Sequence, residues 1–97
     1  MTNYYIRAGY KTLGPYESIV KARAAAIRAL KNGRCTYATT SGDMSVAVST
    51  NKEFSGSAGF HPQVLWRNGT FLWNTWDFGN LSDMPIVNAD GTLRRRS

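Results

Sequence analysis

Residues 64–73 read Val-Leu-Trp-Arg-Asn-Gly-Thr-Phe-Leu-Trp, and this stretch decides the fold: two apolar, aromatic-rich runs flank an Asn-Gly dipeptide. Asn68 and Gly69 suit the two central positions of a type I′ turn, where both residues take positive φ at little cost. The sequence therefore predicts a β-hairpin in which Arg67 lies opposite Thr70 and the strands pair outward from that turn.

Alternation along these two strands divides their side chains between two faces. The predicted core face carries two tryptophans and two other large apolar residues, namely Val64, Trp66, Phe71 and Trp73. The second face carries mixed residues, namely His61, Gln63, Leu65, Arg67, Thr70, Leu72, Asn74 and Trp76. The pattern leaves open whether this second face is covered or exposed.

Residues 16–31 have the composition of a helix, with five alanines among lysines and arginines. At about 100° per residue, one stripe is apolar: Tyr16, Ile19, Val20, Ala26, Ile27 and Leu30, flanked by Ala22 and Ala29. Gly14-Pro15 predicts a turn with Pro15 at the first helical position, and Gly33 predicts the end of the helix. Arg23 interrupts the apolar stripe. We expect its stem to lie along the core edge with its guanidinium in water, or else to meet a buried carboxylate or a ligand.

The remaining β-prone runs are residues 4–10, 34–40 and 44–50, and residues 86–94 form a small terminal hairpin or fray. Residues 51–59 have the composition of a loop. The sequence therefore predicts an α+β domain over residues 1–93: a single helix packed on an antiparallel sheet of about five strands, in the order β-α-β-β-β-β. Residues 94–97 are predicted to be a basic tail, which acts as a flexible electrostatic arm if the partner is a polyanion.

The net charge of +6 is distributed unevenly along the 97 residues. Seven cations stand against a single acid, Glu17, up to Arg34, and three arginines lie near the C-terminus. Such a distribution predicts a positive surface that meets nucleic acid or an acidic protein surface, or that serves solubility. No apolar run approaches the ~20 residues of a membrane span, and the N-terminus lacks the pattern of a secretion signal. We expect a cytoplasmic protein without membrane contact.

Catalytic residue patterns are sparse. Nucleophilic catalysis needs an activated Ser or Cys beside a base, and the chain has one histidine, His61, and one cysteine, Cys35. The lone cysteine excludes an intramolecular disulfide, and the scattered acids match no catalytic or metal-binding spacing. We therefore predict a protein that is not an enzyme and that has no cofactor.

Residues 14–18, Gly-Pro-Tyr-Glu-Ser, precede the alanine-rich run. This entry resembles the strand-to-helix turn of peptidoglycan-binding SPOR domains. The resemblance covers under a third of the chain, and the second helix of those domains has no counterpart in the sequence, so their function is not transferred to it.

Two binding hypotheses remain. The first is nucleic-acid binding through a basic surface, with Tyr5 or Trp76 as stacking platforms; its predicted residues are Arg7, Lys21, Arg28, Lys31, Arg34, Arg94, Arg95 and Arg96. The alternative is a protein–protein interaction module, such as a phage or mobile-element inhibitor of a host complex, that uses the second hairpin face. Its predicted residues are His61, Leu65, Arg67, Leu72 and Trp76.

Overall fold

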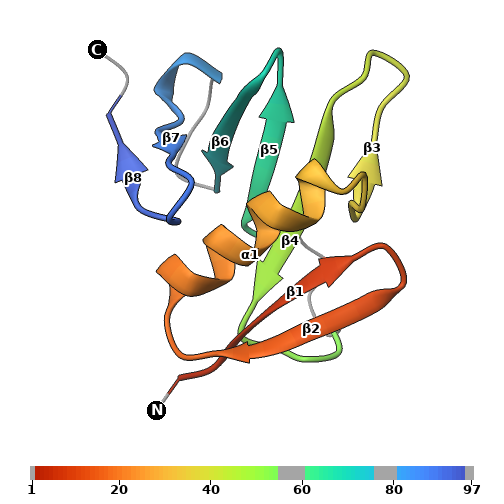
Figure 1. Ribbon diagram of the computed structural model, residues 1–97, viewed down its shortest axis with the longest axis vertical. Helices are drawn as coiled ribbons and strands as arrows, with labels where there is room; N and C mark the ends of the chain where they lie inside the picture. Colours follow the sequence, from red (N-terminus) through yellow and green to blue (C-terminus); the bar gives the residue numbers. More distant parts are fainter. Residues whose placement is uncertain (1, 55–60, 76–80, 96–97) are drawn as a thin grey trace.

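An α-helix packs on an antiparallel sheet in the computed structural model, which describes residues 2–54, 61–75 and 81–95 (Figure 1). The elements in chain order are β1 (Tyr4–Ala8), β2 (Lys11–Tyr16), α1 (Ile19–Lys31), β3 (Tyr37–Ala38), β4 (Met44–Ser49), β5 (Gln63–Arg67), β6 (Thr70–Asn74), the 3₁₀ helix η1 (Leu81–Asp83), β7 (Ile86–Val87) and β8 (Leu93–Arg94). The predicted α+β class is confirmed. The sheet has eight strands in the described part of the chain, rather than about five.

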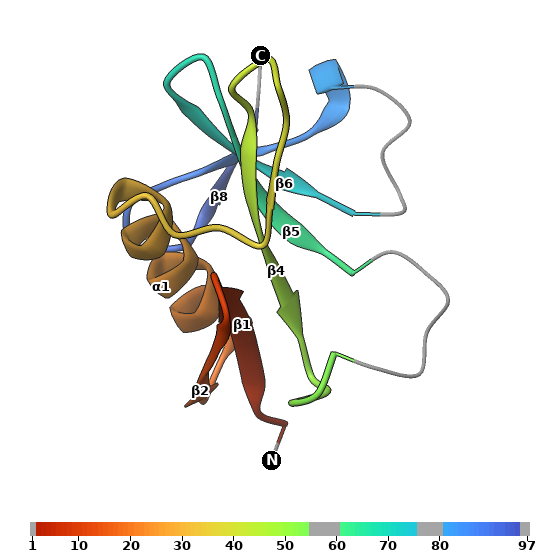
Figure 2. The ribbon, with the colours of Figure 1, turned by 90° about the vertical axis from the view of Figure 1, so that its right-hand side faces the viewer.

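The sheet runs in the order β2-β1-β4-β5-β6-β7-β8, with β3 paired to β4 beside this path, and all its pairs are antiparallel. β4 joins the parts, because it pairs with β3 near its start, with β1 near its end and with β5 along its length. α1 lies on one side of this sheet (Figure 2). Among the described residues, no helix is long and apolar enough to cross a membrane.

The central hairpin has the predicted register: Val64 pairs with Trp73, Leu65 with Leu72, Trp66 with Phe71 and Arg67 with Thr70. Its turn residues have positive φ angles, 51° at Asn68 and 82° at Gly69, as a type I′ turn requires. Local turn chemistry therefore suffices to fix the pairing of β5 with β6.

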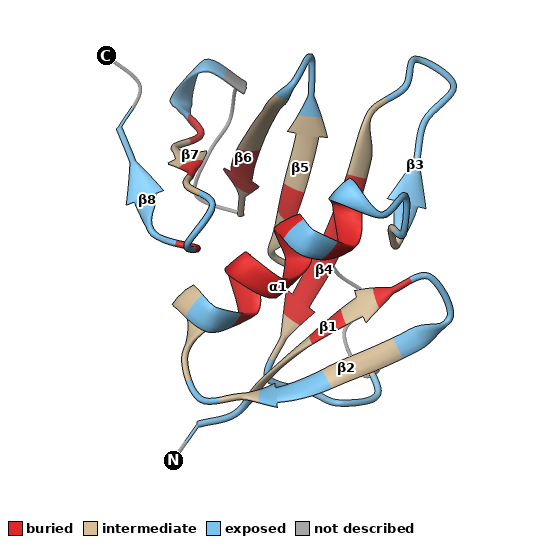
Figure 3. Ribbon diagram, viewed as in Figure 1, coloured by how far each residue is buried: buried red, intermediate tan, exposed pale blue. Residues whose placement is uncertain are grey.

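The hydrophobic core lies between α1 and the sheet (Figure 3). Its buried members come from the helix and from β1, β4, β5, β6 and β7, namely Ile6, Ala8, Ala22, Ala25, Ala26, Ile27, Ala29, Leu30, Val46, Val48, Val64, Trp73 and Val87. Trp66 and Phe71 pack against this cluster while half-buried. The predicted core face of the hairpin is therefore the face toward the helix, and its two ends differ in burial.

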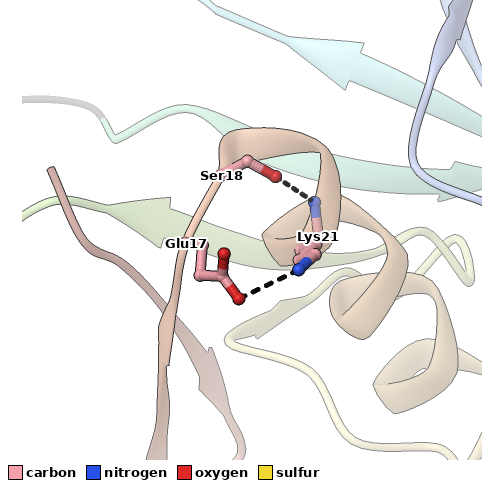
Figure 4. Close-up of polar contacts among 3 residues, drawn as sticks. All are labelled: Glu17, Ser18 and Lys21. Carbon is pink, nitrogen blue, oxygen red and sulfur yellow. Dashed lines mark hydrogen bonds and ion pairs between the residues drawn. The ribbon is translucent and has the colours of Figure 1, made fainter. Parts of the chain in front are cut away.

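The predicted helix entry is wrong. Residues 11–16 form β2, which pairs with β1, and Pro15 lies in this strand instead of at the first helical turn. An edge strand tolerates proline because its outward N–H groups need no partner in the sheet. The helix begins at Ile19, after Ser18, whose side-chain oxygen accepts a hydrogen bond from the Lys21 backbone N–H at 3.2 Å (Figure 4). Pairing with β1 thus competes successfully with the local helix signals.

Two predicted strands are also too long. β1 ends at Ala8, so Tyr10 lies in the β1–β2 turn, fully exposed, instead of sharing the core side with Ile6. The predicted strand over residues 34–40 shortens to β3, Tyr37–Ala38. On the helix, Ala25 is buried although periodicity places it opposite the apolar stripe. More of α1 is covered than its pattern indicates.

Arg23 is buried, with 6% of its surface exposed, so its guanidinium does not reach water as the first expectation had it, and it pairs with no carboxylate of the described residues. Its Nε–H donates to the Gly91 carbonyl oxygen at 2.8 Å, and its guanidinium carbon lies 4.9 Å from the centroid of the Trp73 ring. Burial lowers the pKa of the Arg23 guanidinium, while the nearby Tyr4 opposes that shift. The side chain joins α1 to β6 and to the β7–β8 turn.

The chain from β7 to β8 forms the small terminal hairpin that the sequence left open. Within its turn, the Asp90 carboxylate accepts from the Thr92 hydroxyl at 2.5 Å and from the Thr92 backbone N–H at 3.0 Å, and these bonds lower the pKa of Asp90. Arg94, assigned to a free tail by sequence, belongs to β8.

Gly91 allows the terminal hairpin to approach the helix, and replacing it tests this contact. It has φ of 90°, and a Cβ atom there would overlap the Val20 carbonyl oxygen. Gly69 has φ of 82° with nothing near a Cβ atom, so it is the matched control. We expect Gly69→Ala to cost about 1–2 kcal/mol from backbone strain alone, and Gly91→Ala to cost a further ~1–3 kcal/mol from overpacking. Urea unfolding measures both; equal losses would contradict the close contact.

The two tryptophans of the predicted core face should differ in their contribution to stability. Trp73 is buried beneath Arg23, whereas Trp66 is half-buried. We expect Trp73→Ala to lower the free energy of unfolding by about 3–5 kcal/mol and Trp66→Ala by roughly half as much, because less surface is removed from water in folding. Chemical denaturation with fluorescence detection of the remaining tryptophans compares them. A larger loss at Trp66 would overturn the burial order.

Candidate nucleic-acid interface

Three predicted cationic residues lie on the exposed side of α1. Arg28 and Lys31 occupy its last turn, where positive charge favours the negative end of the helix dipole. Lys21, nearer the N-terminus, forms an ion pair of 3.0 Å with Glu17 (Figure 4). Both members of this pair are largely exposed, so it contributes little to stability, but it reduces the net positive charge at that end of the helix. The stronger positive charge lies toward the C-terminal end.

The end of α1 positions Arg34. Asn32 caps the helix and Gly33 follows with φ of 75°; the Gly33 N–H donates to the Leu30 carbonyl and the Arg34 N–H donates to the Ala29 carbonyl at 2.9 Å. This is the Schellman arrangement, which the sequence indicated through Gly33. It directs the chain back toward the β1–β2 turn, where the Gly9 N–H donates to the Cys35 carbonyl at 3.2 Å.

A cleft of about 240 Å³ lies where the β1–β2 turn meets the segment after the helix. We call this hollow the turn cleft. It is lined by Ala8, Gly9, Tyr10, Lys11 and Arg34. Tyr10 is fully exposed, and Lys11 and Arg34 line the same cleft without an ion pair to any carboxylate of the described residues. The turn cleft therefore combines an exposed aromatic ring with two free positive charges.

A second, polar hollow of about 370 Å³ lies on the sheet face away from α1. We call this hollow the Arg7 pocket. Its described lining residues are Arg7, Thr36, Tyr37, Ala47, Glu53, Phe54 and His61. Arg7 and Ala47 face this side because strand alternation turns their neighbours Ile6, Val46 and Val48 toward the helix. The Arg7 guanidinium carbon lies 5.8 Å from the centroid of the Phe54 ring, and the Phe54 and His61 rings meet edge to face at 5.4 Å.

The two hollows adjoin the same two chain segments. Arg7 of the pocket lies in β1, and Tyr10 of the cleft follows three residues later in the β1–β2 turn. Arg34 of the cleft and Thr36 of the pocket both lie in the segment after α1. These segments are joined by the Gly9–Cys35 backbone bond and by the Thr36 hydroxyl, which donates to the Arg7 carbonyl at 2.5 Å and accepts from the Ala47 N–H at 3.0 Å. The turn cleft and the Arg7 pocket are thus built on one hydrogen-bonded seam.

The other predicted cations lie apart from this seam. Arg94 and Arg95 are exposed at or beside β8, the sheet edge opposite β2. Arg96 lies outside the described residues, as does Trp76, one of the expected stacking platforms; Tyr5, the other, is half-buried. The structure therefore brings Arg7 and Arg34 to the seam, with Lys31 and Arg28 on the adjoining helix end.

The residues of the alternative, protein-directed surface differ in exposure, although Leu65 and Leu72 are cross-strand partners on one face of the hairpin. Leu72 is buried, with 3% of its surface exposed, and Leu65 is half-buried. Arg67 forms an ion pair of 3.5 Å with Asp43, and His61 lines the Arg7 pocket. The described members of this set do not form one exposed apolar patch on the hairpin.

Sequence reasoning missed Tyr10, Lys11, Tyr37, Glu53 and Phe54 as candidate site residues. Alternation over a strand of residues 4–10 would place Tyr10 on the same side as Ile6, and only the observed turn at Gly9 and Tyr10 exposes it. The Gly9-Tyr10 pair was the available signal, because glycine at the end of a strand commonly marks a turn. Glu53 and Phe54 join the pocket through tertiary contacts that no local pattern encodes.

Metal or nucleophilic chemistry gains no support from the described side chains. Within residues 2–54, 61–75 and 81–95, no three His, Cys, Asp or Glu side chains gather as metal ligands. Cys35 packs against the hydrophobic core, whereas the His61 ring contacts Phe54.

Comparison of the chain with protein-family models, with curated proteins and with solved structures finds no match. Any functional conclusion accordingly depends on the chemistry of its own residues.

Proposed function

We propose that this protein is a non-enzymatic binding protein for single-stranded nucleic acid, which it contacts at the turn cleft. The observation that carries the proposal is Tyr10, which is fully exposed and lines one cleft with Lys11 and Arg34. Exposed aromatic rings that offer a face to bases, beside cations that contact phosphates, are the usual means of binding single strands.

The exposure of Tyr10 favours a ligand role over a folding role. A ring left in water gains no burial energy from folding, and the β1–β2 turn does not need an aromatic side chain. The same ring stacks readily on an unpaired base but has no access to the face of a base inside a duplex. We therefore infer a preference for single strands.

The charge around the cleft supports a polyanionic partner. Arg28 and Lys31 extend the positive charge of Lys11 and Arg34 along the C-terminal turn of α1, and none of the four forms an ion pair within the described residues. Neutralising phosphates would release the counterions that these charges and the phosphates hold, which makes binding favourable at low salt.

Tyr10→Ala tests the stacking contact. We expect binding of a fluorescent oligothymidylate of about 12 nucleotides to weaken about 5- to 150-fold, the equivalent of losing one base–aromatic stack. Fluorescence anisotropy measures this affinity, and Tyr10→Phe, which keeps the ring, should bind like the native chain. The melting temperature should not change, because the side chain is exposed. Equal binding by the alanine and native proteins would contradict the stacking role.

Lys11→Ala and Arg34→Ala test the phosphate contacts. For each contact removed, we expect the slope of log affinity against log salt to become shallower by about 0.7, measured between about 50 and about 200 mM salt. Arg94→Ala removes the same charge at the far edge of the sheet and is the matched control; it should change the slope less. Failure of the native chain to bind any oligonucleotide in low salt would overturn the proposal and favour an acidic protein partner.

A further inference from the structure

Opposite charges line the Arg7 pocket without neutralising each other. Arg7 and Glu53 both contribute to its wall, yet the ion pairs within the described residues are Glu17–Lys21 and Asp43–Arg67. The Arg7 guanidinium donates one long hydrogen bond, 3.5 Å, to the Thr12 hydroxyl. Most of its five N–H donors and the Glu53 carboxylate are thus free to meet a ligand.

Aromatic rings surround these two charges. Phe54 lies beneath the Arg7 guanidinium and meets the His61 ring edge to face, and Tyr37, 58% exposed, also lines the pocket. Phe54 has φ of 53°, a conformation rare for a bulky residue and one that costs energy. The Thr36 hydroxyl donates to the Arg7 carbonyl and accepts from the Ala47 N–H, so it has no donor left for a ligand. The other described side chains of the lining offer chiefly a cation, an anion and aromatic rings.

We propose that the Arg7 pocket binds a single guanine base, and this inference rests on the proposed binding of single-stranded nucleic acid. Guanine presents two acceptors, O6 and N7, to which arginine donates in bidentate fashion. Its neighbouring Watson–Crick edge carries two adjacent donors, N1–H and N2–H₂, which match the two oxygens of a carboxylate. Its planar ring suits the aromatic walls.

The other bases fit these charges less well. Adenine offers one donor, N6–H₂, beside the acceptor N1, which repels a carboxylate, and cytosine likewise pairs its N4–H₂ donor with the acceptor N3. Thymine has a single N–H donor between two carbonyl groups. The pocket volume of about 370 Å³ falls in the range of small-ligand sites, and it accommodates one base.

The position of the pocket suits a base from the same strand that contacts the turn cleft. The Cα atoms of Arg7 and Tyr10, three residues apart, are separated by at most about 11 Å, and both hollows adjoin the seam between β1 and the segment after α1. A strand with one base on Tyr10 can therefore place a nearby base at Arg7. Glu53 repels phosphates, so it opposes entry of the backbone and favours entry of a base edge.

The experiment measures binding of oligothymidylates that carry one different base at the centre, since a single guanine avoids guanine quadruplexes. The central bases are guanine, hypoxanthine, adenine and cytosine, and fluorescence anisotropy gives each affinity. We expect guanine to bind at least about fivefold more tightly than adenine or cytosine. Hypoxanthine, which lacks the N2 amino group, should fall between them.

Two variants assign this preference to the pocket. Glu53→Gln should reduce the ratio of guanine to adenine affinity toward one, because the amide offers a single acceptor and no charge. Arg7→Lys should reduce it as well, since lysine lacks the bidentate fork. Lys52→Gln, at a neighbouring exposed position outside the pocket lining, is the matched control and should keep the ratio. Circular dichroism verifies that each variant is folded.

The outcomes separate this inference from the proposed function. Equal affinities for all central bases, with binding still dependent on Tyr10, would overturn the guanine site and leave single-strand binding intact. Free guanosine monophosphate that displaces the oligonucleotide from the native chain, but not from Glu53→Gln, would support the guanine site. It would also show that a free nucleotide can supply the base. Guanosine monophosphate binding without any oligonucleotide binding would support the guanine chemistry and overturn the proposed function.

Discussion

The close approach of an alanine-rich helix to the sheet is the constraint on which the rest of the structure depends. Eight of the thirteen residues of α1 are buried, and five of these are alanines. Small side chains let the helix axis lie near β1, β4 and β5, so that a few larger residues, among them Ile6, Ile27 and Val64, fill the space between the layers. Because the layers are so close, the helix has little room for a polar residue on its inner side.

Arg23 shows the consequence of this closeness. It is held inside by the Trp73 ring and by the Gly91 carbonyl, which replace water as partners of its charge. The same region brings the β7–β8 turn against the helix backbone at Val20 and Ala24, where only a glycine fits. Arg23, the cation that interrupts the apolar stripe of the helix, thus links the helix to the central hairpin and to the C-terminal strands.

At the turn cleft, the residues that serve folding and the residues that we propose for binding are largely separate. The core contains no member of the turn cleft except Ala8, and Tyr10, Lys11 and Arg34 are exposed. The seam that carries the cleft and the Arg7 pocket is held by backbone groups and by the Thr36 hydroxyl. The exposed side chains of the turn cleft are therefore not needed to hold the fold together and are available for contact with a ligand.

The sequence by itself determined the features that depend on contacts between near neighbours. Asn68-Gly69 fixed the turn and with it the register of β5 and β6, and Gly33 fixed the end of α1, because few residues adopt positive φ without strain. Alternation and helical periodicity identified Val64, Trp73, Ile27 and most of the other core residues. The α+β class followed from these signals.

Tertiary structure decided the rest. Residues 11–16 became β2 because pairing with β1 outweighed their local turn and helix signals, and this same hairpin placed Tyr10 in water. The burial of Leu72 and the partners of Arg23 depend on segments far away in the chain. The candidate site combines residues from the ends of β1 and α1 with Glu53, Phe54 and His61. No local pattern encodes such a combination, because it arises only when the sheet brings these segments together.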